Sequence, residues 1–310
     1  MSIHEKIKTW LVPKKSKIGL ELSHFDKVLS DIDFSPVTKY FSVQTNTLDY
    51  EFEKSIISAG AVCFIGSLFM SLTQLGYIRN IDQLFTLASC YMLLDHYIDN
   101  PSIPSVKKKE TIKEIKHFLD SFGYSDNPIV KVVSNRVISM ISSVPSSKQY
   151  LDNLFKIEIE SMKLQQQKDL SREEYLELCE KKGGLTCEAI QSLLELEVTE
   201  GEYELGACIQ LVDDLMDLDD DISLGINTIF SHDLHHYKIL DKIIIYTVNK
   251  IDKLGSKYNF FKVPLYLGLC FGVHINRSRI SSELLNQFEP FIYSETITKD
   301  ELLDWFGSKF

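Results

Sequence analysis

Apolar residues recur at helical spacing along most of this 310-residue chain, and this pattern restricts the fold more than any other feature of the sequence. β-branched residues in strict alternation between hairpin turns are scarce, and glycine (14) and proline (8) are sparse. The sequence therefore predicts an all-α fold with one helical domain over 1–310, in which 1–45 and 295–310 are peripheral segments with weak signals. We expect helices over 51–76, 81–99, 105–122, 128–143, 148–167, 172–198, 201–222, 232–254, 259–275 and 280–289.

The net charge and the cysteine content indicate which binding partners and which cellular location to expect for the protein. The formal net charge is −11 and the pI about 5.3, so a broad basic surface for nucleic acid is not expected. The six cysteines are scattered through apolar stretches without a CxxC pair, which is typical of buried, reduced thiols. No apolar signal-peptide core is visible near the N-terminus. These features predict a cytoplasmic protein that does not bind nucleic acid.

One uncharged stretch, residues 55–72, is at the lower limit of length for a membrane-spanning helix. It is rich in glycine, alanine and serine, no second such stretch exists, and no basic cluster flanks it directly. We therefore expect a central buried helix and no stable membrane insertion. A span or a membrane-dipping helix is the alternative.

A first pair of aspartates ends the helix expected over 81–99. Asp95 and Asp99 are four residues apart, which places both carboxylates on one face with β-carbons about 5–6 Å apart. The two negative carboxylates repel each other, and they lie at the negative end of the helix dipole, where a cation is favoured. The pair therefore indicates either a cation site or an ordinary solvated helix end.

A second cluster places three like charges on one face of a helix. Asp213, Asp217 and Asp221 occupy positions i, i+4 and i+8 of the helix expected over 201–222, among mostly apolar residues. Buried carboxylates need a metal or a charged partner, and hard oxygen ligands suit magnesium or manganese with waters completing the octahedron. The stripe therefore predicts a metal site.

The two clusters together resemble the paired aspartate motifs of class I isoprenoid synthases, the superfamily of polyprenyl diphosphate synthases, squalene and phytoene synthases and class I terpene cyclases. The first motif, DDxxD, is matched in reduced form by Asp95 to Asp99, with His96 in place of an aspartate. Between the motifs, Lys181 to Gly184 is similar in position to the lysine-containing helix that touches the diphosphate. The second motif, QxxDDxxD followed by a further acid, is matched by Gln210, Asp213, Asp214, Asp217 and Asp221.

This resemblance spans about residues 55–275 and implies a helical bundle of the isoprenoid synthase type with a central active-site cavity. It implies an enzyme that ionises a prenyl diphosphate with two or three Mg²⁺ ions, or with Mn²⁺. Dimers are usual in the family, so a homodimer is a further expectation. The implied metal ligands are Asp95, Asp99, Asp213, Asp217 and Asp221, the first four of them catalytic. The implied substrate contacts are Gln210, Asp214, Lys181, Lys182, Arg172, Arg277, Arg279 and Tyr91, the last at the position that limits product length in elongating relatives.

The departures from the family bear on the reaction. Elongating synthases carry a Gly-Gly-Lys-Arg type segment upstream and an arginine pair after the first motif, which together hold isopentenyl diphosphate. Here residues 43–54 lack such a segment, and residues 101–110 offer only three lysines. Because guanidinium forks bind phosphate in a bidentate manner, their absence favours a terpene cyclase that uses one prenyl diphosphate. A prenyltransferase that joins the allyl cation to isopentenyl diphosphate or another acceptor is the nearest alternative.

Two further alternatives are open, and a third fails on its spacing. A non-catalytic paralogue is suggested by His96, whose role the sequence does not define. A metal phosphohydrolase of the HD type is suggested by His232 and Asp233, but no histidine lies between His117 and His232, where that fold needs one. A calcium loop beginning at Asp217 fails, because its sixth and twelfth positions lack the required glycine and glutamate.

Overall fold

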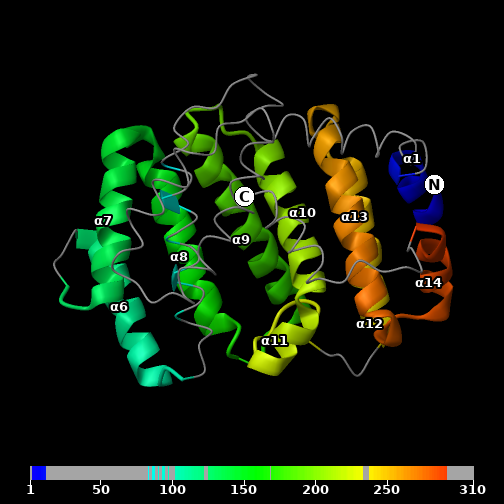
Figure 1. The fold of residues 1–310 in the computed structure, drawn as a ribbon, viewed down its shortest axis with the longest axis horizontal. Helices are drawn as coiled ribbons and strands as arrows, with labels where there is room; N and C mark the ends of the chain where they lie inside the picture. The colour runs from blue at the N-terminus through cyan, green and yellow to red at the C-terminus, as the bar shows by residue number, and fades with distance from the viewer. Residues whose placement is uncertain are drawn as a thin grey trace, which may run out of the picture. The chain divides into compact units, whose positions relative to one another are not determined.

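The computed structural model describes residues 2–11, 102–121, 125–167, 169–232 and 237–291, together with seven single residues between 83 and 97. Every regular element in these ranges is a helix, so the all-α prediction is confirmed for the described chain (Figure 1). The chain forms two compact units, and a single domain remains a prediction. The first unit is Met1–Asp33, Lys163–Cys187 and Thr199–Thr298, and the second is Phe34–Met162, Glu188–Val198 and Lys299–Phe310.

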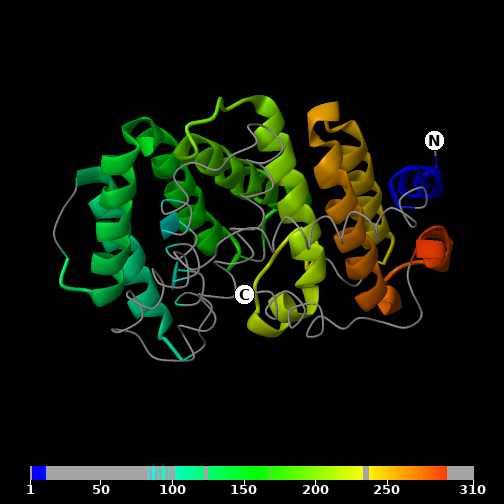
Figure 2. The ribbon, with the colours of Figure 1, turned by 45° about the horizontal axis from the view of Figure 1, so that its top comes forward.

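In the first unit, α10, α12 and α13 pack side by side, and α1 packs against α12, α13 and α14 (Figures 1 and 2). The α10–α13 interface is close because Gly268 and Gly272 lie under Val212 and Leu215, where a β-carbon would be within 2.9 Å of either side chain. The elements of this unit are α1 (Ile3–Leu11), most of α9 (Arg172–Leu193), α10 (Glu200–Met216), α11 (Leu218–Leu224), α12 (Tyr237–Lys253), η3 (Ser256–Tyr258), α13 (Asn259–Ile275), η4 (Arg277–Arg279), α14 (Ser282–Phe288) and η5 (Glu289–Phe291).

In the second unit, α6 (Ser105–Ser121) packs against α7 (Pro128–Ser143), which leads through η2 (Pro145–Ser147) into most of α8 (Lys148–Leu164). The start of α7 is fixed by its sequence: the Asn127 side chain accepts a hydrogen bond from the backbone of Ile129 at 3.1 Å, and Pro128 fits the first helical position. Between residues 83 and 97 the described positions are helical. Five of them are buried, and four of these, Leu87, Cys90, Leu93 and Leu94, are apolar.

Two predicted helices, 128–143 and 259–275, have the observed bounds, and the other predicted helices from residue 105 onward differ at one or both ends. The helix predicted over 51–76 and both ends of the one predicted over 81–99 lie outside the described residues. The helix predicted over 172–198 ends at Leu193, because Glu195 adopts a left-handed conformation (φ 57°) and Thr199 begins a new helix. The predicted single helix over 201–222 is wrong. It is two helices, α10 and α11, which meet at Asp217.

Within the described residues, no helix combines the length and the hydropathy that crossing a membrane requires. The uncharged stretch 55–72 lies outside these residues, so the expectation of a buried helix there remains a prediction.

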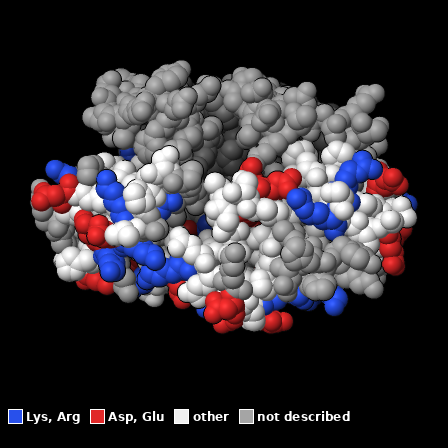
Figure 3. Space-filling view, turned by 90° about the horizontal axis from the view of Figure 1, so that it is seen from below, with Lys and Arg blue, Asp and Glu red and all other residues white. Residues whose placement is uncertain are grey.

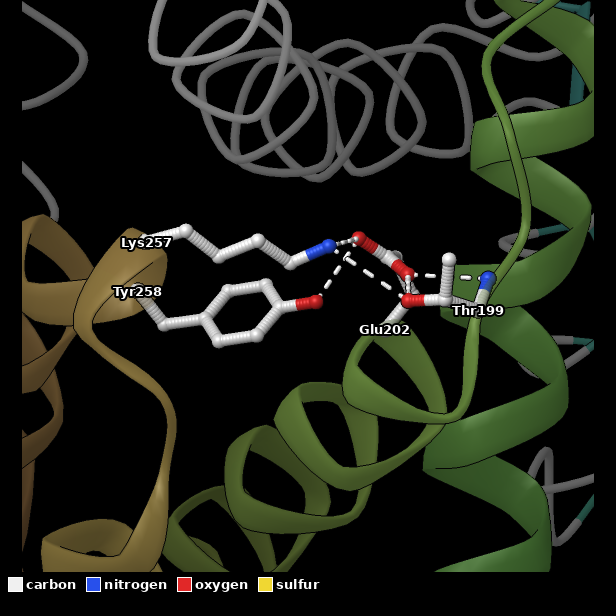
Figure 4. A network of polar contacts seen from close by, with 4 residues as sticks. All are labelled: Thr199, Glu202, Lys257 and Tyr258. Carbon is white, nitrogen blue, oxygen red and sulfur yellow. Dashed lines mark hydrogen bonds and ion pairs between the residues drawn. The ribbon is translucent and has the colours of Figure 1, made fainter.

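A buried ionic network fixes the start of α10 (Figure 4). Glu202 has no exposed surface, and its carboxylate accepts hydrogen bonds from the Thr199 backbone at 3.0 Å, from Lys257 Nζ at 2.8 Å and from the Tyr258 hydroxyl at 2.7 Å. Burial opposes ionisation, but the hydrogen bonds from Lys257, Thr199 and Tyr258 lower the pKa of Glu202 to about 2. The network ties α10 to η3, the turn that precedes α13.

The substitution Glu202→Gln is expected to reduce the free energy of unfolding by about 1–3 kcal/mol, because the buried side chain at position 202 loses the charge that strengthens its hydrogen bonds from Lys257, Thr199 and Tyr258. A carboxyl whose folded pKa lies below its ordinary 4.5 stabilises the protein above that value, and the contribution is lost as the pH falls toward 2. The difference between wild type and variant in urea unfolding should therefore shrink below pH 4.5. Glu200→Gln, an exposed change in the same turn, serves as the control and should behave as wild type.

Candidate functional site

The site begins where α9 crosses α10 in the first unit, at Gly183 and Gly206. A β-carbon on Gly183 would overlap the Gly206 carbonyl oxygen and lie 2.7 Å from Cβ of Gln210, and a β-carbon on Gly206 would overlap the Gly183 carbonyl. The two backbones are thus in direct contact, which only glycine permits. Side chains within a turn of this crossing, including Lys182 and Gln210, are consequently brought to the same place.

A small pocket lies beside this crossing, with room for about one water-sized group. It can accept one atom or group of a ligand rather than a whole small molecule. Three of the residues predicted to contact substrate, Lys182, Gln210 and Asp214, share its wall although they come from separate sequence motifs. The full lining is Gln165, Tyr175, Leu178, Cys179, Lys182, Gln210, Asp214, Asn227, Thr228 and Ile229.

Asp214 is the buried acid of the pocket, with 8% of its surface exposed. Gln210 Nε2 donates to its Oδ1 at 2.8 Å. Burial raises the pKa of Asp214 above its ordinary value, although the Gln210 hydrogen bond, the Lys182 charge and the Cys179 thiol oppose the rise. The carboxylate is therefore held in place by neighbours that compensate its burial only in part.

The predicted aspartate stripe bends at its middle member. Asp217 has φ −95° and ψ 8°, so it ends α10 and precedes α11. The backbone N–H of Asp217 still bonds to the Asp213 carbonyl, and that of Asp221 to the Asp217 carbonyl, each at 2.9 Å. The three residues thus keep helical spacing across the break. Asp213 is exposed, which corrects the expectation that the whole stripe is desolvated, while Asp217 and Asp221 are partly buried.

Asp221 carries a strongly perturbed carboxyl group. Burial, followed by the negative charges of Asp214 and Asp217, raises the pKa of its carboxyl from 3.8 to about 8. A carboxylate in such a field gains more from a bound cation than an ordinary surface aspartate does.

Among the described residues, no three histidine, cysteine, aspartate or glutamate side chains are grouped closely enough to hold a metal ion by themselves. Magnesium is usually bound by one or two carboxylates, with waters and substrate phosphates as its other ligands, so a complete protein cage is not required. The donor set at Asp217 and Asp221 fits that mode. Asp95 and Asp99, the predicted partners across the site, lie outside the described residues, as do Tyr91 and His96.

The structure distinguishes the two lysines of the Lys-Lys-Gly-Gly segment. Lys181 is exposed and forms an ion pair with Glu177 at 2.6 Å on the surface of α9. Lys182 is partly buried, lines the pocket and lowers the pKa of both Asp214 and Asp221. Of the two, Lys182 is therefore the residue placed to meet an anion.

The three predicted arginines do not belong to the lining of the pocket in the described chain. Arg279 pairs with Asp219 of α11 at 2.6 Å and bonds to Asn276, which accounts for its guanidinium. Arg277 is exposed, and Arg172 lies partly buried at the start of α9. A diphosphate contact from these arginines remains a prediction.

Several lining residues were missed in the sequence. The Asn227 side chain donates to the Gln165 carbonyl at 2.7 Å and the Asn227 backbone to the same carbonyl at 2.9 Å, while the Tyr175 hydroxyl donates to the Gln167 carbonyl. These bonds hold the segment after α8 against the pocket. Two signals were present: Tyr175 and Cys179 precede Lys182 at helical spacing, and Asn227 follows the left-handed Gly225 that ends α11.

His232, which had suggested an HD-type phosphohydrolase, makes a tilted ring contact with Tyr175, with ring centroids 4.9 Å apart. Asp233 lies outside the described residues, so the second half of that motif has no described geometry.

No protein-family model, characterised protein or solved structure matches this chain.

Proposed function

We propose that this protein is an enzyme of the class I isoprenoid synthase type that ionises a prenyl diphosphate with the help of Mg²⁺ ions, as a terpene cyclase. The proposal includes the family's helical bundle with a central cavity. It rests on one observation above all: Lys182 from one motif and Gln210 and Asp214 from another line the same pocket. A cation-binding acid stripe beside an anion-binding lysine suits a ligand that contains both a metal and a diphosphate.

The electrostatics of the stripe give the proposal a second support. The pKa values of Asp214 and Asp221 are both raised, first by burial and then by the charge of Asp217, to which the charge of Asp214 adds at Asp221. A bound divalent cation offsets both penalties. The fold therefore keeps carboxylates in a costly arrangement for which metal binding is the simplest explanation.

The expected roles follow from these positions. When bound, the metal neutralises the charge that develops on the departing diphosphate. Asp217 and Asp221 would hold this metal, with Asp213 at the exposed end of the stripe. Lys182 supplies positive charge to the diphosphate oxygens, and Gln210 orients the Asp214 carboxylate.

The substitution Lys182→Ala is expected to weaken binding of inorganic diphosphate in the presence of Mg²⁺ by tenfold to about a hundredfold, the range expected for loss of one charge-assisted hydrogen bond. Lys181→Ala is the matched control. It removes an exposed ion pair and should change the binding constant less than about twofold. Equal effects of the two substitutions, measured by titration calorimetry, would contradict the assignment of Lys182.

The proposed activity is tested by incubating the purified protein with prenyl diphosphates of ten, fifteen and twenty carbons, with Mg²⁺ or with a chelator. We expect Mg²⁺-dependent release of diphosphate from at least one of them, and mass spectrometry of the extract should identify a cyclised or rearranged hydrocarbon or alcohol. Failure to consume any of the three would argue against the proposal.

A prenyltransferase is the second candidate, and one observation favours it. Lys107, Lys108 and Lys109 lie consecutively in the first turns of α6, where a helix start also attracts anions. Figure 3 shows basic side chains gathered on the face of the molecule where α6 begins. Products lengthened by five carbons only when isopentenyl diphosphate is added would favour this candidate over the cyclase.

A further inference from the structure

The break between α10 and α11 is held by residues that follow α13. In an uninterrupted α-helix, the carbonyl of Leu215 would accept the backbone N–H of Asp219. Here that carbonyl accepts a hydrogen bond from Asn276 Nδ2 at 2.8 Å. Asn276 is the residue that ends α13. A side chain from a distant part of the chain therefore satisfies the end of α10, just before the break at Asp217.

Asn276 is a buried amide whose polar groups are all bonded, with 1% of its surface exposed. Its Nδ2 also donates to the Gly272 carbonyl at 2.9 Å, and its Oδ1 accepts from Arg279 Nη1 at 3.0 Å. A flipped amide would turn its oxygen toward two carbonyls and its N–H groups toward a guanidinium, so the network itself selects one orientation. The Leu215 carbonyl is consequently held by a side chain that is itself fixed.

Arg279 extends this network to the other side of the break. Its Nη2 pairs with the carboxylate of Asp219 at 2.6 Å, while its Nη1 bonds to Asn276. Asp219 is in the first turn of α11, between Asp217 and Asp221. The two side chains of the ion pair are 33% and 66% exposed, so the pair contributes less than the buried amide does. Together, Asn276 and Arg279 contact the helices on both sides of the break.

The direction of α11 decides where Asp221 lies relative to Asp217. Asp217 is at the break itself, and Asp221 follows one turn later, its backbone N–H bonded to the Asp217 carbonyl at 2.9 Å. Two carboxylates bind one metal ion well only if their mutual position is fixed before the metal arrives. A contact that fixes the break therefore also fixes the two acids.

We propose that Asn276 is a positioning residue, whose side chain holds the break between α10 and α11 in the form that presents Asp217 and Asp221 to one metal ion. Arg279 supports it through Asp219. The consequence for the metal rests on the proposed function, whereas the role at the break does not.

The first test measures how diphosphate release depends on the Mg²⁺ concentration in Asn276→Ala. This variant leaves room for a water molecule, which can satisfy the Leu215 carbonyl without fixing it. The Mg²⁺ concentration for half-maximal rate should rise tenfold to about a hundredfold, the range for losing a group that orients a metal ligand. At saturating Mg²⁺ the rate should return close to the wild-type value. Asn286→Ala, the same exchange at an exposed position of α14, should match wild type throughout.

This split between metal requirement and maximal rate separates positioning from general destabilisation. A partly unfolded enzyme loses rate by the same factor at every Mg²⁺ concentration. That result for Asn276→Ala, or an unchanged Mg²⁺ requirement, would overturn the inference.

The second test needs no substrate. Hydrogen exchange, followed by mass spectrometry, should show faster exchange of the amides of residues 215–224 in Asn276→Ala than in wild type, and unchanged exchange in α7. Asp219→Asn should give a smaller increase in the same segment, because it removes only the exposed ion pair. Asp220→Asn removes the same charge from the same turn and should give no increase. If wild type consumes no prenyl diphosphate, the proposed function fails while exchange still decides the role at the break. Unchanged exchange of residues 215–224 in Asn276→Ala excludes that role.

Discussion

Asp221→Asn is expected to make the metal-free protein more stable and to abolish most of its activity. The substitution removes a carboxylate that is disfavoured by burial and by the charges of Asp214 and Asp217. We expect a gain of about 1–2 kcal/mol in the free energy of unfolding at neutral pH, after allowance for solvent screening. Loss of this proposed metal ligand should reduce Mg²⁺-dependent diphosphate release at least about a hundredfold, the upper limit for losing a residue that only supports a ligand. Opposite effects on stability and activity are typical of functional sites.

The pH dependence of this effect has a defined sign. The folded pKa of Asp221 is about 8 and its ordinary value is 3.8, so between these values the folded state binds more protons than the unfolded state. The stability of the metal-free wild type should therefore fall as the pH rises toward 8, and Asp221→Asn should remove that slope. Asp220→Asn, an exposed neighbour, is the control for thermal unfolding with and without Mg²⁺. A destabilised Asp221→Asn variant that keeps activity would contradict both parts of this prediction.

Gly183→Ala is expected to have the largest effect on folding. The added methyl group would overlap a backbone carbonyl of α10, and backbone atoms cannot move aside as a flexible side chain can. Separation of α9 from α10 should cost at least about 2 kcal/mol, at the upper end of overpacking effects. It should also weaken diphosphate binding, because Lys182 and Asp214 would move apart.

The control for this prediction is Gly255→Ala. There the new β-carbon would be 3.9 Å from the nearest atom, an ordinary contact, so the free energy of unfolding should change by less than about 0.5 kcal/mol. Chemical unfolding of the two variants measures the difference directly. Equal stabilities would mean that the helix crossing tolerates a side chain and does not fix the site.

The fold was predictable where local signals and helical spacing agree. The Asn127 cap with Pro128 at the first position marks the start of α7, and both ends of that helix were predicted. No glycine or proline marks the break between α10 and α11 at Asp217, and the helical spacing of the aspartates continues through it. The break could therefore not be predicted from the sequence. Glu195 adopts a left-handed conformation that its residue type rarely takes, so the early end of α9 was missed.

The parts of the candidate site that depend on the spacing of residues along one helix could be predicted from the sequence. Gln210 and Asp214 are four residues apart, and their hydrogen bond follows from helical geometry. The choice between Lys181 and Lys182 depends on the rotation of α9, which is set by the contact between Gly183 and Gly206. Asn227 joins the pocket through tertiary bonds to the segment after α8, and no spacing rule relates two segments that are so distant in sequence.

On the proposed function, this pocket and the aspartate stripe bind Mg²⁺ and diphosphate together. Titration calorimetry of the purified protein with inorganic diphosphate, in the presence of Mg²⁺ and then in the presence of a chelator, tests it most directly. We predict clear binding with Mg²⁺, loss of that binding with the chelator, and a large reduction in Asp221→Asn with Mg²⁺ present. Binding of equal strength with and without the metal, or no binding in either condition, would contradict the claim.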